Sequence, residues 1–229
     1  MLQEIVDLEH SGPLGAGVLS YHRANCTLRS QAGNSLRSQH MADLKIWKPT
    51  KQQIEEAKDK TIRDLIAPNL KLLFVGINPG LYTAAIGRHF GRPGNRFWPA
   101  LHAGGFTPRL FSPFESDELL KLNYGITNMV SRATARADEL SDEELRAGAK
   151  ALTRKVKKYK PRFIAIVGLT SYRVAFDQPK AAVGRQDLKI GGAMVWVLPN
   201  PSGLNAHFQP KRLGELFGEL RRAVEREAK

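Results

Sequence analysis

The sequence predicts an α/β fold built on a mostly parallel β-sheet that helices cover on both faces. Three apolar runs, at 70–75, 163–168 and 194–198, have the length and composition of buried strands. Segments with helical spacing lie between these runs, so strands and helices alternate along the chain. Because the runs lack a polar face, we expect helices over both faces of the sheet.

Different signals mark the expected helices and the segments between them. Residues 51–66 have apolar side chains at roughly helical spacing, and Thr50 can cap the start of this helix. Residues 141–158 open with Ser-Asp-Glu-Glu, which is typical of a capping box. Residues 123–128 are expected to form a turn that leads into a short strand or loop, and 131–140 a polar surface loop. The remaining helices are expected at 95–103, 116–122, 171–176 and 211–226.

Charge and composition separate the start of the chain from the rest. The 229 residues carry a net charge of +13, but residues 1–45 hold as many acids as Lys and Arg, so the excess lies in 46–229. A folded domain this basic attracts polyanions, and nucleic acid is the expected partner. We expect 1–45 to be a poorly ordered N-terminal extension, because it is polar and lacks a sustained period. Met41, where the composition changes, is an alternative start of the chain.

Several classes of protein are excluded by what the sequence lacks. One cysteine, Cys26, cannot build an intramolecular disulfide, a zinc site of several thiolates or an iron–sulfur cluster. No stretch is long and apolar enough to span a bilayer, and the first residues lack the basic start of a secretory signal. These features fit a cytoplasmic protein without a membrane partner, associated with the nucleoid if the source is bacterial.

Two polar loops follow predicted strands and are candidates for a site. The first reads Gly-Ile-Asn-Pro-Gly at 76–80, and the second reads Asn-Pro-Ser-Gly-Leu-Asn at 200–205. Carboxyl ends of parallel strands meet at one edge of a sheet, so both loops can line one cleft. Their amides, hydroxyl and backbone N–H groups can orient water and stabilise an anion, but they cannot strongly abstract a proton.

These loops, in this order and at this separation, resemble those of the mismatch-specific uracil-DNA glycosylases and their thymine-DNA glycosylase relatives. The resemblance runs from about Ile62 to the last helix and includes the segments 87–90, 94–98 and 125–130. It implies a three-layer α/β/α glycosylase domain over 46–229. Such a protein, a monomer without metal or cofactor, flips uracil out of double-stranded DNA with G:U or G:T mismatches, and mispaired thymine more weakly. It then hydrolyses the N-glycosidic bond and leaves an abasic site.

The resemblance also implies roles for individual residues. Asn78 is implied to be the catalytic residue, which positions the attacking water. The residues implied to bind the base are Ile77, Thr83, His89, Phe90, Asn128, Asn200 and Ser202. The residues implied to wedge into the duplex are Gly203, Leu204 and Asn205. Thr83 is implied to lie near the 5-position of the pyrimidine, so uracil is expected to be preferred to thymine.

Two departures from the family pattern qualify this implication. Ala206 stands where some members have an arginine, so His207 or Arg212 is left to assist the wedge. Asn78 and Asn200 stand where the more powerful uracil-DNA glycosylases have an aspartate and a histidine. Because an amide cannot take a proton from water, turnover is expected to be modest.

Other interpretations remain open at the level of sequence. The protein can be a non-catalytic DNA or mismatch sensor on the same scaffold, with Asn78 kept for structure. Phe90 can be a core residue, His89 a surface residue, and Thr83 a cap for the turn after Gly80. A phosphate-binding α/β protein is disfavoured, because no glycine-rich phosphate loop is present.

Overall fold

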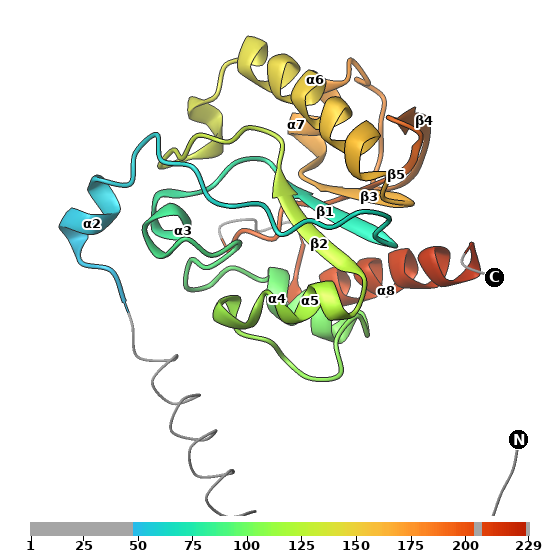
Figure 1. Cartoon of the computed structure of the whole chain (residues 1–229), viewed down its shortest axis with the longest axis horizontal. Helices are drawn as coiled ribbons and strands as arrows, with labels where there is room; N and C mark the ends of the chain where they lie inside the picture. Colours follow the sequence, from blue (N-terminus) through green and yellow to red (C-terminus); the bar gives the residue numbers. More distant parts are fainter. Residues whose placement is uncertain (1–47, 204–207, 228–229) are drawn as a thin grey trace, which may run out of the picture. The chain divides into compact units, whose positions relative to one another are not determined.

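The computed structural model describes residues 48–203 and 208–227. A five-stranded sheet with the order β2-β1-β3-β5-β4 forms the centre of this part of the chain (Figure 1). Its strands are β1 (Leu72–Gly76), β2 (Tyr124–Asn128), β3 (Phe163–Val167), β4 (Gly184–Ile190) and β5 (Ala193–Leu198). The β4–β5 pair is antiparallel and the other pairs are parallel, which confirms the predicted mostly parallel α/β sheet.

Alternate residues of the strands pack into two separate hydrophobic cores, one on each face of the sheet. In β1, Leu72 and Phe74 face one core, whereas Leu73 and Val75 face the other. Helices α4 (Phe97–Ala103) and α8 (Pro210–Arg226) cover the first face. Helices α6 (Asp142–Tyr159) and α7 (Leu169–Ala175) cover the second (Figure 1). Strands buried on both faces explain why the sequence shows continuous apolar runs there instead of alternation.

The expected helix over 51–66 is wrong over most of its length. Only α2 (Lys51–Glu55) is helical, and Thr50 caps it with a capping box. Leu65 instead pairs with Ile126 of β2, donating and accepting backbone bonds of 2.9 and 2.8 Å. This bridge satisfies the backbone groups of Ile126 at the otherwise open edge of β2, where unpaired groups would be costly. This long-range pairing outweighs the helical spacing of the apolar residues.

Of the remaining elements, some agree with the sequence prediction and others were not predicted. Ser141 caps α6 through the predicted capping box, and residues 124–128 form a strand. Strand β4 was not expected, because most of its residues are exposed and it therefore lacks an apolar run. Other short elements are α3 (Leu81–Ile86), which was also not expected, α5 (Glu118–Lys121) and the 3₁₀ turns Pro113–Glu115 and Ala137–Glu139.

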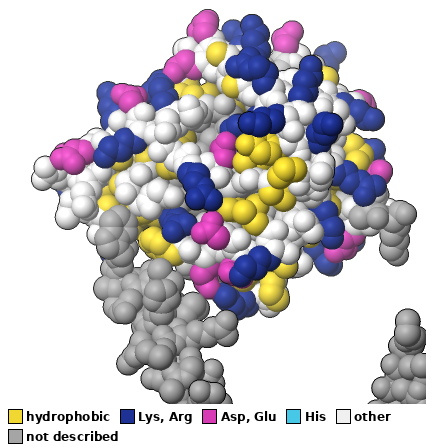
Figure 2. Space-filling view, in the orientation of Figure 1, with side chains coloured by type: hydrophobic (Ala, Val, Ile, Leu, Met, Phe, Trp, Pro, Cys, Tyr) yellow, Lys and Arg dark blue, Asp and Glu magenta, His cyan; other side chains and the backbone are white. Residues whose placement is uncertain are grey.

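Lysine and arginine side chains are spread over the face shown in Figure 2, with fewer acidic side chains among them. This distribution agrees with the excess of positive charge in 46–229. Within the described ranges, no helix is both long enough and apolar enough to cross a membrane. The expected N-terminal extension, the wedge residues Leu204 and Asn205, and His207 lie outside the described residues.

Candidate active site

A cavity of about 410 Å³ opens at the carboxyl ends of β1, β2 and β3. It is the place where ligands bind in open α/β sheets. All the residues predicted to bind the base lie in its lining, together with Asn78. Gly203, a predicted wedge residue, does not line it. The structure therefore brings the two loops to one site, while the roles of their residues stay predictions.

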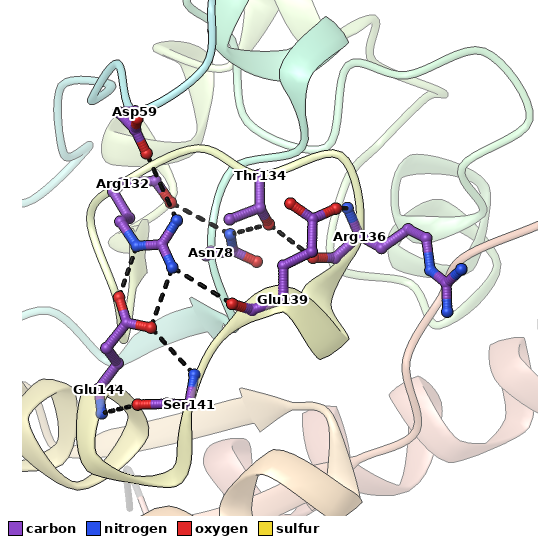
Figure 3. A network of polar contacts seen from close by, with 8 residues as sticks. All are labelled: Asp59, Asn78, Arg132, Thr134, Arg136, Glu139, Ser141 and Glu144. Carbon is purple, nitrogen blue, oxygen red and sulfur yellow. Dashed lines mark hydrogen bonds and ion pairs between the residues drawn. The ribbon is translucent and has the colours of Figure 1, made fainter.

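The amide of Asn78 is held by the segment that the sequence predicted to be a surface loop. Its Nδ2 donates to the backbone oxygen of Arg132 at 3.1 Å and to Oγ1 of Thr134 at 2.7 Å (Figure 3). The Thr134 hydroxyl in turn donates to the backbone oxygen of Arg136 at 2.7 Å. A carbonyl can only accept, and the Thr134 hydrogen is already used, so these partners fix which amide atom is the nitrogen. The Asn78 oxygen is thereby left as the acceptor that this amide can offer to a ligand.

Arg132 anchors this loop to the start of α6. Its guanidinium donates to both carboxylate oxygens of Glu144, at 2.5 and 2.9 Å, and to the backbone oxygen of Glu139 at 3.3 Å (Figure 3). Glu144 also accepts from the backbone nitrogen of Ser141, which completes the capping box. The hydrogen bonds from Arg132 lower the pKa of Glu144 to about 2, so this carboxylate stays ionised at neutral pH. The helix cap and the loop that orients Asn78 therefore share one network.

His89 is buried, with 4% of its surface exposed, so it is not a surface residue. Its Nε2 lies 3.1 Å from the backbone oxygen of Arg63. Burial lowers the pKa of His89 to about 4, and the ring is neutral at physiological pH. Because a carbonyl only accepts, Nε2 carries the hydrogen and Nδ1 is an acceptor. His89 can therefore bind a polar ligand but cannot donate a proton from an imidazolium.

The pKa of His89 predicts a dependence of stability on pH. In the unfolded chain the ring titrates near 6.5, so between pH 6.5 and 4 the unfolded state binds more protons. The free energy of unfolding should thus be highest above pH 6.5 and fall towards pH 4, by at most about 1.4 kcal/mol per pH unit. Urea unfolding at a series of pH values measures this slope. The slope should be shallower in His89→Gln; equal slopes in both proteins would contradict the prediction.

Phe90 combines a core contact with a position on the cavity wall. Its ring stacks on Phe97, with 3.9 Å between the centroids and 14° between the planes, and it also lines the cavity. Its backbone has a φ of 52°, which is rare for a non-glycine residue. Gly76 lies beneath, and a Cβ there would be 2.5 Å from Oδ1 of Asn128. The glycine therefore lets Asn128 and Phe90 approach the strand end closely.

The second loop is attached to the start of α4. The Arg96 guanidinium donates to the backbone oxygens of Phe208 at 2.8 Å and Gly203 at 3.2 Å. The Arg96 backbone nitrogen donates to Pro201, and Oδ1 of Asn200 accepts from the backbone nitrogen of Ser202. These contacts fix the loop on both sides of the residues that are not described. Arg212, a candidate to assist the wedge, forms ion pairs with Glu215 and Glu219 at 3.1 and 3.3 Å.

Thr83 is buried in α3 and lines the cavity. Gly80 occupies the N-cap position of α3, and the structure shows no side-chain hydrogen bond at this cap. The alternative role of Thr83 as a cap is therefore not observed. Its position leaves the side chain as part of the cavity wall.

The sequence did not predict several residues of the cavity. The lining also contains Gly80, Arg92, Asn95, Val167 and the segment 134–138. Pro93 and Gly94 are a turn signal. This signal could have placed the residues on either side of them, Arg92 and Asn95, near a strand end. No local sequence signal predicts that segment 134–138 lines the cavity, because this part of the chain is held at the site through hydrogen bonds to Asn78, more than 50 positions away.

The cavity is lined by amides, hydroxyls, a neutral imidazole, an aromatic ring and the charged side chains of Arg92, Arg136 and Asp138. Asp138 is the one carboxylate among the described lining residues, and it is paired with Arg136. In 48–203 and 208–227 there is no group of His, Cys, Asp and Glu side chains that could hold a metal ion. Such a cavity can bind a planar polar ring and hold a water molecule, but it offers no strong general base.

Together, the fold and the site define an α/β protein with a polar cavity at the carboxyl ends of its parallel strands. The family model described as "Uracil DNA glycosylase superfamily" matches residues 63–221, and the chain belongs to this superfamily. Membership supports a uracil-DNA glycosylase type of activity in general, with DNA as the partner.

The chain is also similar to a solved structure from Methanosarcina acetivorans, a protein provisionally assigned as a uracil DNA glycosylase. The two sequences are 21% identical over 73% of this chain and 98% of the other, with a TM-score of 0.49. A likeness at this level carries no inference about activity.

Proposed function

We propose that this protein is a mismatch-specific DNA glycosylase that releases uracil, and more weakly thymine, from mispairs with guanine. The observation that carries the proposal is the orientation of the Asn78 amide. Both of its N–H bonds are used by Arg132 and Thr134, so its oxygen is the atom that can accept a hydrogen bond from water. Superfamily membership supplies the substrate class, a uracil in DNA.

In the proposed reaction the bond between the sugar C1′ and N1 of the base breaks first. The electron pair leaves with the base, whose anion is delocalised over the ring and its carbonyl oxygens. The oxygen of a water molecule then bonds to C1′, and the water's proton passes to solvent or to the departing base. Because the sugar resembles an oxocarbenium ion, the water needs position more than deprotonation. An amide oxygen at a fixed point can supply this, and positioning is worth several kcal/mol of barrier.

The walls of the cavity suit an extruded pyrimidine. Phe90 is backed by Phe97, so its ring is rigid and can stack on a base. Asn128 and neutral His89 offer hydrogen-bonding atoms for the edge of the base. The positive charge of the domain supports affinity for DNA through neutralisation of phosphates.

The proposed substrate order can be tested with one set of labelled oligonucleotides. Release should be fastest from a guanine–uracil pair and slower from guanine–thymine and adenine–uracil pairs, with alkaline cleavage of the abasic site as the readout. A single-stranded uracil substrate shows whether pairing matters. DNA binding without release of any base would favour the alternative of a non-catalytic mismatch sensor.

Thr83 should restrict access of thymine to the cavity. Thr83→Ala removes bulk from the wall, so thymine release should rise relative to uracil release. One methyl group in a tight pocket is worth about 1–3 kcal/mol, or roughly 10–200-fold. Single-turnover rates on guanine–thymine and guanine–uracil duplexes measure the ratio. Thr83→Ser, which loses only the methyl group, is the matched control, and an unchanged ratio in both variants would remove Thr83 from the contact with the base.

A further inference from the structure

Among the described charged side chains that line the cavity, all but one belong to an ion pair. Three formally charged side chains line it: Arg92, Arg136 and Asp138. Arg136 and Asp138 form an ion pair with two hydrogen bonds, one of them 3.0 Å from Nε to Oδ1. Burial keeps His89 neutral. Arg92 therefore carries the uncompensated charge among the described residues of the lining.

Arg92 also differs from its neighbouring arginines. Arg88 pairs with Asp117, Arg109 with Glu115, and Arg132 with Glu144, while Arg96 donates to backbone oxygens. Within the described segment 88–136, Arg92 is the one arginine whose guanidinium has no hydrogen bond or ion pair. Its side chain is exposed. An arginine at a ligand cavity without an acidic partner is available to bind an anion.

The backbone beneath Arg92 is fixed although its guanidinium is not. The Arg92 backbone oxygen accepts from the backbone nitrogen of Asn95 at 3.0 Å, and Pro93 restricts the turn between them. Oδ1 of Asn95 then accepts from the backbone nitrogen of Phe97 at 2.9 Å, at the first residue of α4. The turn thus carries the side chain on a rigid base, which lowers the entropy lost when the guanidinium binds a ligand.

We propose that Arg92 binds the DNA phosphate next to the extruded nucleotide. The proposal rests on the proposed function, because it requires that a nucleotide enters the cavity from a duplex. The phosphates that flank such a nucleotide must follow its sugar to the edge of the cavity. The planar guanidinium matches two phosphate oxygens, and such charge-assisted bonds are the strong ones.

Arginine also reads guanine in DNA, through two hydrogen bonds to O6 and N7. A guanine opposite the lesion stays in the duplex, whereas Arg92 lines the cavity that takes the extruded nucleotide. The geometry therefore favours the phosphate. The two roles differ in their dependence on sequence, because a phosphate contact weakens binding equally for all opposite bases.

The test compares Arg92→Gln with Arg162→Gln. Arg162 is also exposed, and its side chain forms no hydrogen bond or ion pair in the described structure. It lies at the amino end of β3, whereas the cavity lies at the carboxyl ends of the strands. Both variants lose one charge. The probe is a duplex with 2′-fluoro-2′-deoxyuridine opposite guanine or adenine, which resists cleavage because fluorine destabilises the sugar cation. Fluorescence anisotropy measures the Kd from low to high salt.

Arg92→Gln should reduce the slope of log K against log salt by about 0.9, the value for one phosphate contact, with both opposite bases. Arg162→Gln should leave the slope unchanged, and Arg92→Lys should keep a slope close to that of the wild-type protein.

Two results would overturn the proposal while the wild-type protein binds and releases uracil. These are an unchanged slope in Arg92→Gln and a loss of affinity confined to duplexes with guanine opposite. A wild-type protein that neither binds the duplex nor releases uracil would instead overturn the proposed function, and the phosphate contact with it.

Discussion

Replacing Asn78 with alanine should lower the single-turnover rate of uracil excision by on the order of 10²-fold or more, the size expected for losing one preorganised polar group. The variant lacks the amide oxygen that would hold the attacking water. DNA affinity should change little, because it depends largely on charge neutralisation, and the stacking surface of Phe90 remains. Both quantities can be measured on one guanine–uracil duplex, with excision at saturating enzyme and binding by anisotropy.

Two outcomes would contradict this account of Asn78. Excision that survives in Asn78→Ala would make the residue part of a turn without a role in the chemistry. Binding that collapses together with excision would make its role structural. The melting temperature distinguishes a folding defect, because the variant also loses the hydrogen bonds to Arg132 and Thr134.

Replacing Thr134 with valine should slow excision by roughly tenfold to a hundredfold, since small misplacements of a reacting group are costly. Valine has the shape of threonine but cannot accept the 2.7 Å hydrogen bond from Nδ2 of Asn78. The amide then loses one of the two contacts that fix its orientation, so its oxygen is held less firmly where the water must bind. Thr134→Ser keeps the hydroxyl and should retain most of the rate. Single-turnover kinetics at saturating enzyme compare the two variants.

A double-mutant cycle shows whether Thr134 acts through Asn78. In the Asn78→Ala background, Thr134→Val should have almost no further effect on the rate. If the two losses multiply, Thr134 acts independently of Asn78 and the proposed orientation of the amide is not its function. A drop in melting temperature with equal losses in Thr134→Val and Thr134→Ser would indicate that the residue only stabilises the loop.

The fold class could be predicted from the sequence because its signals are local. Strands β1, β3 and β5 are buried on both faces, so each is a continuous apolar run. The capping box at Ser141 is visible as a pattern of neighbouring residues. Turn residues directly after β1 and β5 indicated where the site lies, because strand ends of a parallel sheet share an edge.

Elements that depend on distant partners could not be predicted in the same way. Residues 56–66 have helical spacing, yet Leu65 pairs with β2, which begins near residue 124. Strand β4 lies at the edge of the sheet with most side chains exposed, so its apolar pattern is weak. In both cases hydrogen bonds to another segment determine the backbone conformation, and the local pattern does not contain them.

By itself the sequence determined the three apolar strands, the two polar loops that follow strands, and part of the set of residues that line one cavity. The tertiary structure alone decided how these residues are oriented and charged. Asn78 is oriented by Thr134, 56 positions away, in a segment whose composition predicts only a surface loop. His89 is neutral because burial disfavours its charged form. Asp138 pairs with Arg136, whereas the side chain of Arg92 has no ion pair within the described residues. Orientation, burial and charge pairing depend on which distant groups come together, and this is settled only when the chain packs.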